Sequence, residues 1–257
     1  MKKIYKFLLN SLPRPLLIRL SYLFKIIAPI AYKGNNVQCP VCEKSFRKFL
    51  SYGSNIAHRE NVLCPYDLTL ERHRLMWLYL QKTDFFKAEK LDVLHVAPEQ
   101  CFHKKFKSQN NLNYTTADLE SPIADLHFDL HSIPLEDNLY DVIFCNHVME
   151  HVKDDLQCMK ELYRVMKPGG WGIFQVPIDY DNPETYEDNT ITSEKDREIH
   201  FWQKDHLRLY GLDYPKKLEK AGFKIDVFDP KDSLGDIDYE KLRLNPKELI
   251  FIAKKII

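Results

Sequence analysis

The sequence has no excess of charge of either sign. Its 257 residues include 37 lysines and arginines and 37 aspartates and glutamates, so the chain as a whole has no electrostatic attraction to nucleic acid. The balance is uneven along the chain, because every charged side chain before Glu43 is basic and residues 179–198 are mostly acidic. The composition argues against a nucleic-acid partner, and the length allows one α/β domain with an appendage.

The first 36 residues lack the uninterrupted apolar run of a secretory signal or a membrane-spanning helix. Prolines and basic side chains interrupt both candidates, at Pro13, Arg14, Pro15, Arg19 and Lys25. At about 100° per residue, the apolar side chains between Leu16 and Ile27 share one helix face and the polar ones share the other. Residues 1–36 are therefore expected to form an amphipathic basic segment at an anionic membrane surface, with packing on the protein's own core as the alternative.

The six cysteines do not form the pattern of a small secreted disulfide scaffold. Two turns have metal-ligand spacing, Cys39-Pro-Val-Cys42 and Cys64-Pro-Tyr-Asp67, and each presents two ligand side chains three positions apart. We expect one structural Zn²⁺ on Cys39, Cys42, Cys64 and Asp67, with His58 or His73 as substitutes for Asp67. A module that has lost its metal and kept its fold is the competing interpretation. The other cysteines, Cys101, Cys145 and Cys158, are expected to be buried thiols in a reducing, cytoplasmic setting.

The next segment changes to helical and then to strand periodicity. Leu70–Lys82 predicts a helix that connects a zinc-ribbon-like module, residues 37–88, to the rest of the chain, with residues 71–74 as a solvated first turn. Leu91–Val96 predicts a short buried strand that stops at Ala97-Pro98 and leads into a helix. Three further strand candidates follow at βαβ spacing: Asn113–Ala117, Leu139–Cys145 and Trp171–Val176. Their continuous apolar runs are typical of a doubly wound, Rossmann-like α/β sheet.

A doubly wound sheet binds ligands outside the carboxyl ends of its strands, beside the first strand. Residues 95–101 should therefore contact a cofactor. The second strand ends at Asp118, where an acidic side chain accepts hydrogen bonds from ribose hydroxyls in nucleotide-binding folds. The strand that follows residue 139 ends at Asn146 and His147, and His147 is a candidate general base, with a positioning role equally open.

Three segments carry a family resemblance: Asp129–Val142 (DLHSIPLEDNLYDV), Asn146–Val152 (NHVMEHV) and Glu161–Trp171 (ELYRVMKPGGW). They resemble class I S-adenosylmethionine-dependent methyltransferases. The third is the most specific, and its Gly169-Gly170 pair is expected to end a helix through a left-handed turn. The resemblance covers residues 89–257 and implies a seven-stranded sheet whose last strand, within Lys247–Lys254, is antiparallel.

The same resemblance implies S-adenosylmethionine as cofactor and a set of contacts: His95, Val96, Ala97, Pro98, Glu99, Asp118, Leu119, Asp129, Leu130, Asn146 and His147. The family's first loop is rich in glycine, whereas Ala97, Glu99 and Cys101 stand in those places here. The methionine end of the cofactor must then be held differently, and Glu99 is a candidate partner for its ammonium group. Segments Cys39–Cys42, Cys64–Arg74 and His95–Glu99 also resemble a bacterial subgroup that joins a zinc-ribbon-like module to this domain, with Asp67 and Thr69 where the subgroup has Cys and Ser.

Residues 177–210 form a long acidic and aromatic insertion, expected to act as a lid on the acceptor side and to present His200, Asp205 and His206. The candidate catalytic bases are His147, His151, Asp205 and His206. The expected function is methyl transfer to an oxygen or nitrogen of a small, lipid-linked or glycan acceptor, in the cytoplasm or on the inner face of the cytoplasmic membrane. The zinc-ribbon-like module also resembles that of ribosomal-RNA guanine methyltransferases, so methylation of an RNA base is one alternative. A non-catalytic binding protein on the same fold is the other.

Overall fold

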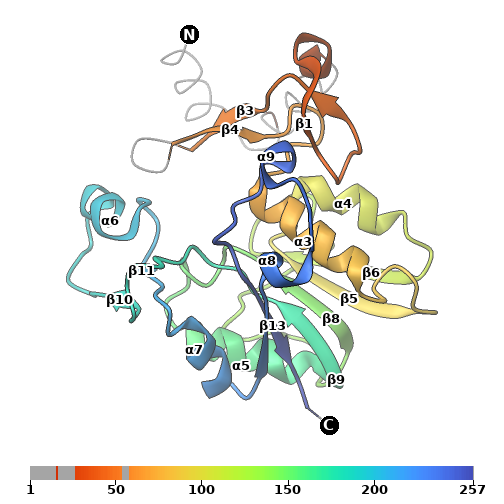
Figure 1. The fold of residues 1–257 in the computed structure, drawn as a ribbon. Helices are drawn as coiled ribbons and strands as arrows, with labels where there is room; N and C mark the ends of the chain where they lie inside the picture. Colours follow the sequence, from red (N-terminus) through yellow and green to blue (C-terminus); the bar gives the residue numbers. More distant parts are fainter. Residues whose placement is uncertain (1–15, 17–26, 54–57, 257) are drawn as a thin grey trace. The chain divides into compact units, whose positions relative to one another are not determined.

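The structure is a computed structural model that describes Leu16, residues 27–53 and residues 58–256 (Figure 1). The predicted amphipathic segment lies mostly outside the described residues, and within it residues 27–31 are helical. No helix in the described part of the chain is long and apolar enough to cross a membrane.

The chain forms two compact units. The first comprises the residues up to Leu78 together with Asp236–Pro246, and the second comprises Tyr79–Gly235 and Lys247–Ile257. The sequence predicted boundaries after residues 36 and 88. It did not predict that residues 236–246 return to the first unit, because a contact between segments so far apart leaves no local pattern.

The first unit contains two small antiparallel ladders. Strand β1 (Lys33–Gln38) pairs with β2 (Ser45–Phe46), and β3 (Leu50–Tyr52) pairs with β4 (Arg59–Leu63). Helix α3 (Glu71–Lys82) follows β4, as predicted, and the short helix α9 (Tyr239–Leu242) belongs to the same unit.

The prediction of a solvated first turn for α3 is wrong, because the Arg74 side chain is fully buried. Arg74 donates to the carbonyl oxygens of Val62 and Thr69 at 2.9 and 3.0 Å and to those of Leu242 and Arg243 at 2.8 and 2.6 Å. These bonds connect β4, the second cysteine turn and α9. The buried guanidinium is tolerated because its N–H groups donate to these four carbonyl oxygens.

The second unit is built on a seven-stranded sheet in the order β12-β13-β9-β8-β5-β6-β7. Its strands are β5 (Leu91–Val96), β6 (Leu112–Asp118), β7 (Leu126–His127), β8 (Tyr140–Cys145), β9 (Met166–Ile173), β12 (Lys224–Phe228) and β13 (Ile250–Lys254). Strand β13 is antiparallel to both of its neighbours, and the pairs from β9 to β7 are parallel. The predicted α/β, Rossmann-like, seven-stranded fold is confirmed. Strand β5 lies between β6 and β8, so the sheet has its switch point there.

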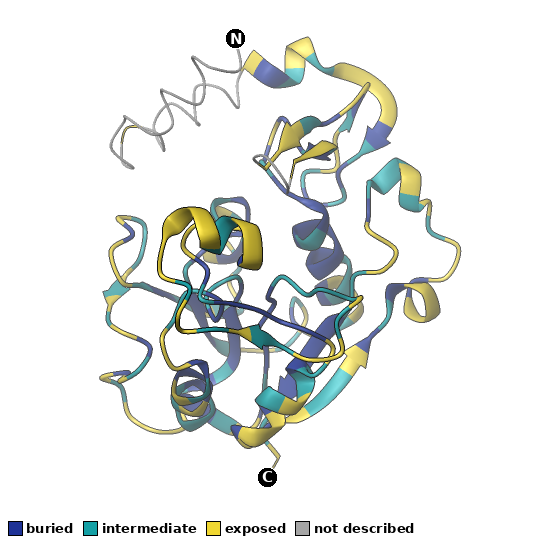
Figure 2. Ribbon diagram, turned by 90° about the vertical axis from the view of Figure 1, so that its left-hand side faces the viewer, coloured by how far each residue is buried: buried dark blue, intermediate teal, exposed yellow. Residues whose placement is uncertain are grey.

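The central strands are buried on both faces (Figure 2). Ile143 and Cys145 of β8 belong to a core that includes residues of helices α5 (Asp155–Val165) and α7 (Tyr214–Lys220). The Phe144 ring between them instead contacts Phe85, Phe106 and Trp171, with ring centroids 5.6, 5.7 and 6.0 Å away. Because successive side chains of a strand point to opposite faces, this alternation requires two covering layers.

The Gly169-Gly170 pair does not end α5 as predicted. Helix α5 ends at Val165, and β9 begins at Met166 and includes both glycines. Gly169 has a φ of +82° and lies where the register between β8 and β9 shifts. A Cβ atom at Gly170 would lie 2.9 Å from the Asp141 carbonyl oxygen. The glycines therefore permit an irregular strand pairing, and β9 starts and ends earlier than the predicted Trp171–Val176.

The insertion after β9 is folded. It contains β10 (Tyr186–Glu187), α6 (Glu194–Phe201) and β11 (Arg208–Leu209), and β10 pairs with β11. Helix α6 is mostly exposed (Figure 2) and is closed at its amino end by the Ser193 side chain, which accepts from the Asp196 amide. A buried arginine, Arg208, joins β11 to the loop after β8 by donating to Met149 and Val152 carbonyl oxygens.

Candidate functional site

Two non-glycine residues adopt the left-handed backbone conformation at the ends of neighbouring strands. Ala97 after β5 has a φ of 49°, and His147 after β8 has a φ of 55°. This conformation costs about 1–3 kcal/mol for a residue with a Cβ atom, and such strain is concentrated at functional sites. Ala97 keeps the tight turn of the first loop without glycine, and its amide donates to the Ala117 carbonyl oxygen at 2.8 Å.

The Glu99 carboxylate lies between β5 and β8. Glu99 occupies the N-cap position of α4 (Gln100–Lys107), but its side chain does not cap that helix. One oxygen contacts His95 Nε2, and the other accepts from Asn146 Nδ2 at 3.2 Å. Asn146 Oδ1 in turn accepts from the Gln175 amide at 3.1 Å. The sequence marked Glu99 and Asn146 as separate candidates, and the structure brings them together.

His95, predicted as a cofactor contact, is fully buried. Its Nδ1 lies 2.8 Å from the Tyr114 hydroxyl. Burial raises the pKa of Tyr114 and keeps that hydroxyl protonated, so Tyr114 can donate to Nδ1 while Nε2 donates to Glu99. Any effect of His95 on a ligand must therefore act through the orientation of Glu99. Val96 and Pro98, also predicted as contacts, have buried side chains.

Asp118 ends β6, the neighbour of β5 on the other side. Its Oδ1 accepts from the backbone amides of Glu120 and Ser121 at 2.9 and 2.8 Å. These bonds orient the carboxylate at the carboxyl edge of the sheet. Leu119, the next residue, is 64% exposed, which is unusual for a large apolar side chain beside a sheet end.

The predicted pair at residues 129 and 130 is split by burial. Asp129 is exposed, and its Oδ1 accepts from the His131 amide at 2.9 Å and lies 2.6 Å from His131 Nδ1. Leu130 is buried in the core. The Asp129 side chain can therefore contact a ligand at the surface, whereas Leu130 can affect a ligand site only by packing beneath it in the core.

Three of the four predicted base candidates, His147, His151 and His206, lie around a carboxylate that the sequence did not mark as a site residue, Glu150, and the fourth, Asp205, contacts His151. His147 Nδ1 lies 3.2 Å and His151 Nε2 lies 3.9 Å from Glu150 Oε1. His151 Nδ1 lies 3.6 Å from Asp205 Oδ2, and the rings of His151 and His206 are edge to face at 4.8 Å. His200, the other insertion histidine predicted to serve the lid, instead lies near Tyr186. In the sequence, the available signal for Glu150 was an acidic residue between two histidines, His147 and His151.

Residues 149–151 form a turn after β8, and α5 begins at Asp155 after the Asp154 cap. Burial alone would raise the pKa of Glu150, but the hydrogen bond from His147 and the charges of His147 and His151 outweigh it and lower the pKa. Glu150 is therefore an ionised carboxylate in a buried position.

The two cysteine turns of the first unit have matching backbones. The amide of Glu43 donates to the Cys39 carbonyl oxygen at 2.8 Å, and the amide of Leu68 donates to that of Cys64 at 3.0 Å. Glu43 and Leu68 both have left-handed φ values, 62° and 61°. Asp67 therefore occupies in the second turn the position that Cys42 has in the first.

One ligand atom from each of Cys39, Cys42, Cys64 and Asp67 lies within 4.8 Å of the others. Cys42 Sγ and Cys64 Sγ are 3.8 Å apart, which is the separation of about 3.8 Å that two thiolates have on a tetrahedral Zn²⁺ with Zn–S bonds of about 2.3 Å. Asp67 Oδ2 lies 3.3 Å from Cys39 Sγ, while Oδ1 accepts from the Thr69 amide and hydroxyl at 3.0 and 2.8 Å. The donor set fits a structural zinc ion.

The two histidine substitutes do not join this group in the described part of the chain. His58 is exposed with Nδ1 3.4 Å from the Gly53 carbonyl oxygen, and His73 Nδ1 accepts from the Leu70 amide at 3.1 Å. Burial and the Cys39 charge raise the pKa of Asp67 to about 6. A bound cation would reverse that effect by stabilising the carboxylate.

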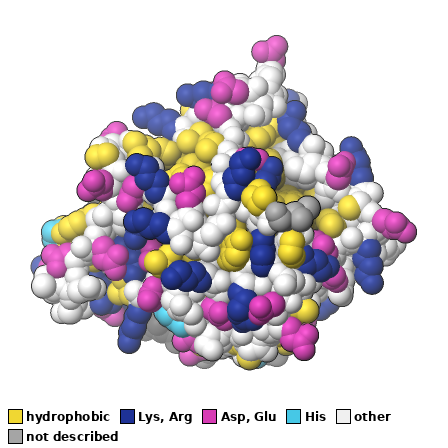
Figure 3. Space-filling view, turned by 90° about the horizontal axis from the view of Figure 1, so that it is seen from below, with side chains coloured by type: hydrophobic (Ala, Val, Ile, Leu, Met, Phe, Trp, Pro, Cys, Tyr) yellow, Lys and Arg dark blue, Asp and Glu magenta, His cyan; other side chains and the backbone are white. Residues whose placement is uncertain are grey.

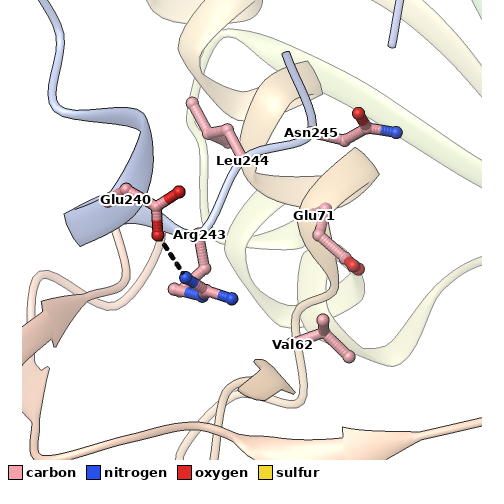
Figure 4. A pocket seen from close by; sticks show the side chains of 6 residues that line it. All are labelled: Val62, Glu71, Glu240, Arg243, Leu244 and Asn245. Carbon is pink, nitrogen blue, oxygen red and sulfur yellow. Dashed lines mark hydrogen bonds and ion pairs between the residues drawn. The ribbon is translucent and has the colours of Figure 1, made fainter. Parts of the chain in front are cut away.

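The first unit also has a shallow pocket, lined by Val62, Glu71, Glu240, Arg243, Leu244 and Asn245 (Figure 4). Arg243 Nη1 donates to Glu240 Oε2 at 2.6 Å across it. Glu71, the other charged residue of the lining, instead pairs with Arg59 at 3.6 Å, so each charged side chain of the pocket has an ion-pair partner.

The sheet order and the switch point beside β5 are those of a doubly wound fold, which offers a ligand site at the carboxyl ends of its strands, where Asp118 lies. Residues 89–174 match the family described as "Methyltransferase domain". This match agrees with the resemblance of the sequence to class I S-adenosylmethionine-dependent methyltransferases and lies within the second unit.

Among curated proteins, the chain is 33% identical over 94 residues to a malonyl-[acyl-carrier protein] O-methyltransferase of Marinomonas sp., covering 37% of this chain and 29% of that protein. It is 40% identical over 55 residues to a demethylmenaquinone methyltransferase of Staphylococcus epidermidis, covering 21% of this chain and 22% of that protein. The chain thus spans about a third or less of the length of these relatives. A solved structure named "[4+2]-Cyclase SpnF" matches with a TM-score of 0.52 at 14% identity, over 93% of this chain and 96% of that chain. This last similarity concerns the fold alone.

Proposed function

We propose that the protein binds S-adenosylmethionine at the carboxyl ends of β5, β6 and β8 and transfers its methyl group to an oxygen or nitrogen nucleophile. The observation that carries the proposal is the Glu99 network, in which His95 and Asn146 hold one carboxylate at the switch point. An oriented carboxylate there matches the cofactor's ammonium group, and Asp118 matches the ribose hydroxyls. The exposed Leu119 side chain offers an apolar surface for the adenine ring.

The residues present fit the cofactor even though the first loop lacks glycines. Ala97 adopts the backbone conformation that glycine usually supplies. The larger side chain at residue 99 turns toward Asn146, so it forms part of the site. When bound, S-adenosylmethionine supplies an electrophilic methyl group. The chain's own residues then align the acceptor with that group and remove a proton where the acceptor is a hydroxyl.

The proton acceptor is proposed to come from His147 or His151, because both lie beside ionised Glu150 and both have exposed ring area, 26% and 34%. Asp205 and the buried His206 are the other candidates, and they flank His151 from the insertion. A base must reach its proton within about 3 Å, so partial exposure favours the first two.

Calorimetry with S-adenosylmethionine tests the cofactor site. Asp118→Ala and Glu99→Gln should each weaken binding about 10- to 100-fold, since a hydrogen bond to a charged group contributes about 1.5–3 kcal/mol. Asp226→Ala on β12, an edge strand, is the matched control and should bind like wild type. No heat with wild type, or unchanged affinity for Asp118→Ala, would reject this site. Binding without turnover on any acceptor would support the non-catalytic alternative.

The acceptor is proposed to be a small molecule or a lipid- or glycan-linked group. The two relatives act, by their names, on malonyl-[acyl-carrier protein] and demethylmenaquinone, and the net charge of the present chain is zero. On the face drawn in Figure 3 acidic and basic side chains are interspersed, with no continuous basic area. Radiolabelled methyl transfer into a lipid and glycan extract is expected, and labelling of purified ribosomal RNA in its place would establish the RNA alternative.

We also propose that Cys39, Cys42, Cys64 and Asp67 hold a structural Zn²⁺. The 3.8 Å separation of two thiol sulfurs and the matching turns support it. Elemental analysis of protein purified without chelator should find zinc, and Asp67→Ala should lower the affinity. His58→Ala is the control, because this exposed histidine lies outside the ligand group. Zinc lost from His58→Ala but kept in Asp67→Ala would show that the fourth ligand is wrong.

Residues 1–36 are proposed to attach the protein reversibly to an anionic membrane. Each basic residue near such a surface contributes on the order of 1 kcal/mol, and the apolar Ile27 and Ile30 side chains are 59% and 77% exposed. Flotation with anionic vesicles at low salt should carry the full chain upward, and a chain that starts at Asn35 should stay at the bottom. Equal flotation of both would reject the proposal, and precipitation of the shortened chain would favour packing of the segment on the protein itself.

A further inference from the structure

Three side chains of the second unit lie close together, two from the loop after β8 and one from the insertion just before β11. One ligand atom from each of Glu150, His151 and His206, here named the Glu150 cluster, lies within 4.8 Å of the others. Two donors bound to one tetrahedral metal ion at about 2.0–2.2 Å lie about 3.3–3.6 Å apart. Closing these separations by at most about 1.5 Å would therefore bring all three donors onto a single ion.

Two atoms of the cluster lack a hydrogen-bond partner within the described residues, Glu150 Oε2 and His206 Nε2. Both groups are almost completely buried, with 1% exposure of the Glu150 side chain and of His206. Buried polar atoms nearly always have a partner, and a buried carboxylate with an unsatisfied oxygen is destabilising by several kcal/mol. A cation between these two atoms would satisfy both.

The surrounding hydrogen bonds set the histidine tautomers for metal binding. His206 Nδ1 lies 2.8 Å from the Phe201 carbonyl oxygen, and His151 Nδ1 lies 3.2 Å from that of Asp205. A carbonyl oxygen can only accept, so each Nδ1 carries the proton and each Nε2 presents its lone pair. Metal-bound histidines are held in this way, with the second ring nitrogen donating to a carbonyl or carboxylate oxygen.

We propose that Glu150, His151 and His206 bind a divalent first-row transition metal ion, for which two imidazoles and one carboxylate suit Zn²⁺ best. Three protein ligands leave a coordination position open to water or to an acceptor oxygen, unlike the four-ligand cysteine site. A part for this ion in the reaction would rest on the proposed methyltransferase function, whereas metal binding itself does not. With both nitrogens of His151 engaged by the ion and the Asp205 carbonyl oxygen, His147 is then the proton acceptor of the two favoured above.

Cobalt loading of the full chain tests the inference, with Co²⁺ titrated into chelator-treated protein. Thiolate ligation at the cysteine turns gives sulfur-to-cobalt charge-transfer absorption, and the Glu150 cluster should bind a further equivalent without adding to that band. Glu150→Gln and His206→Gln should weaken this further equivalent at least about 100-fold, since losing even a residue that only supports a ligand costs about 10- to 100-fold. His200→Gln, an exposed histidine of the same insertion, should leave it unchanged.

Equal cobalt uptake by wild type and Glu150→Gln would overturn the inference. His151→Gln guards against misfolding, because this ring is 34% exposed, and it should lose the same equivalent while its circular dichroism stays that of wild type. Calorimetry with S-adenosylmethionine on the same samples separates the two proposals. A retained further equivalent without cofactor binding rejects only the methyltransferase function, and cofactor binding without that equivalent rejects only the metal site.

Discussion

Two arginines of the second unit make the same number of hydrogen bonds but differ in how far they are buried. Comparing them predicts how much free energy of unfolding each contributes. Arg208 donates five, to the carbonyl oxygens of Met149, Val152 and Lys153 and twice to Glu187. Arg164 also donates five, to two carbonyl oxygens, to Asp137 and twice to Glu161. The Arg208 side chain is 1% exposed and that of Arg164 is 30% exposed.

Arg208→Met should lower the free energy of unfolding by about 3–4 kcal/mol. Breaking a buried ion pair typically costs about 3–5 kcal/mol because the partners stay buried and unpaired, and the 33% exposure of Glu187 reduces that value. Arg164→Met should cost only about 1 kcal/mol, since water replaces its lost bonds. Burial, and not the number of bonds, sets the difference.

Thermal unfolding followed by circular dichroism measures both variants. At about 2–4 °C per kcal/mol for a unit of this size, Arg208→Met should melt about 6–16 °C below wild type and Arg164→Met about 2–4 °C below. Hydrogen exchange should rise in residues 146–154 and 186–209 of Arg208→Met, because the arginine joins these segments. Equal losses in the two variants, or unchanged exchange in these segments, would refute the reasoning.

Three further predictions concern single residues. Ala97→Gly should increase the free energy of unfolding by up to about 1 kcal/mol and raise the melting temperature slightly, because glycine removes the strain of a φ of 49°. A lower melting temperature would contradict this prediction. Phe144→Ala should cost about 3–5 kcal/mol in denaturant unfolding, since the ring is fully buried among aromatic neighbours, and a loss below about 1 kcal/mol would count against the packing. Burial alone would raise the pKa of Asp155, but the Tyr210 hydrogen bond and the charges of Arg208 and Lys217 lower it below the ordinary 3.8. Asp155 therefore stabilises the fold above that pH and loses this effect as pH falls through the lowered value, so Asp155→Asn should flatten the acid limb of a stability curve.

The fold was predictable from local pattern. Short apolar runs such as that of β8 are typical of strands covered on both faces, and the spacing between β5, β6, β8 and β9 leaves room for the crossovers of a parallel sheet. The metal-type turns were equally visible, because two ligands three positions apart are a local property. The local pattern gave a wrong prediction at Gly169-Gly170. A Gly-Gly pair can end a helix or lie in an irregular strand, and here the pairing with the neighbouring strand β8 decides between the two.

Residue types and chain order were enough to mark His147, His151, Asp205 and His206, but not to show that the three histidines surround Glu150. Only the tertiary structure brought residues 205 and 206 next to residue 151, through the buried Arg208 that joins β11 to the loop after β8. In the same way, the sequence identified Glu99 as a departure from a glycine position, and only packing revealed His95 and Asn146 as the groups that hold it. Sequence periodicity reports which face of an element is buried, whereas the partner of a buried polar group is chosen by contacts between distant segments.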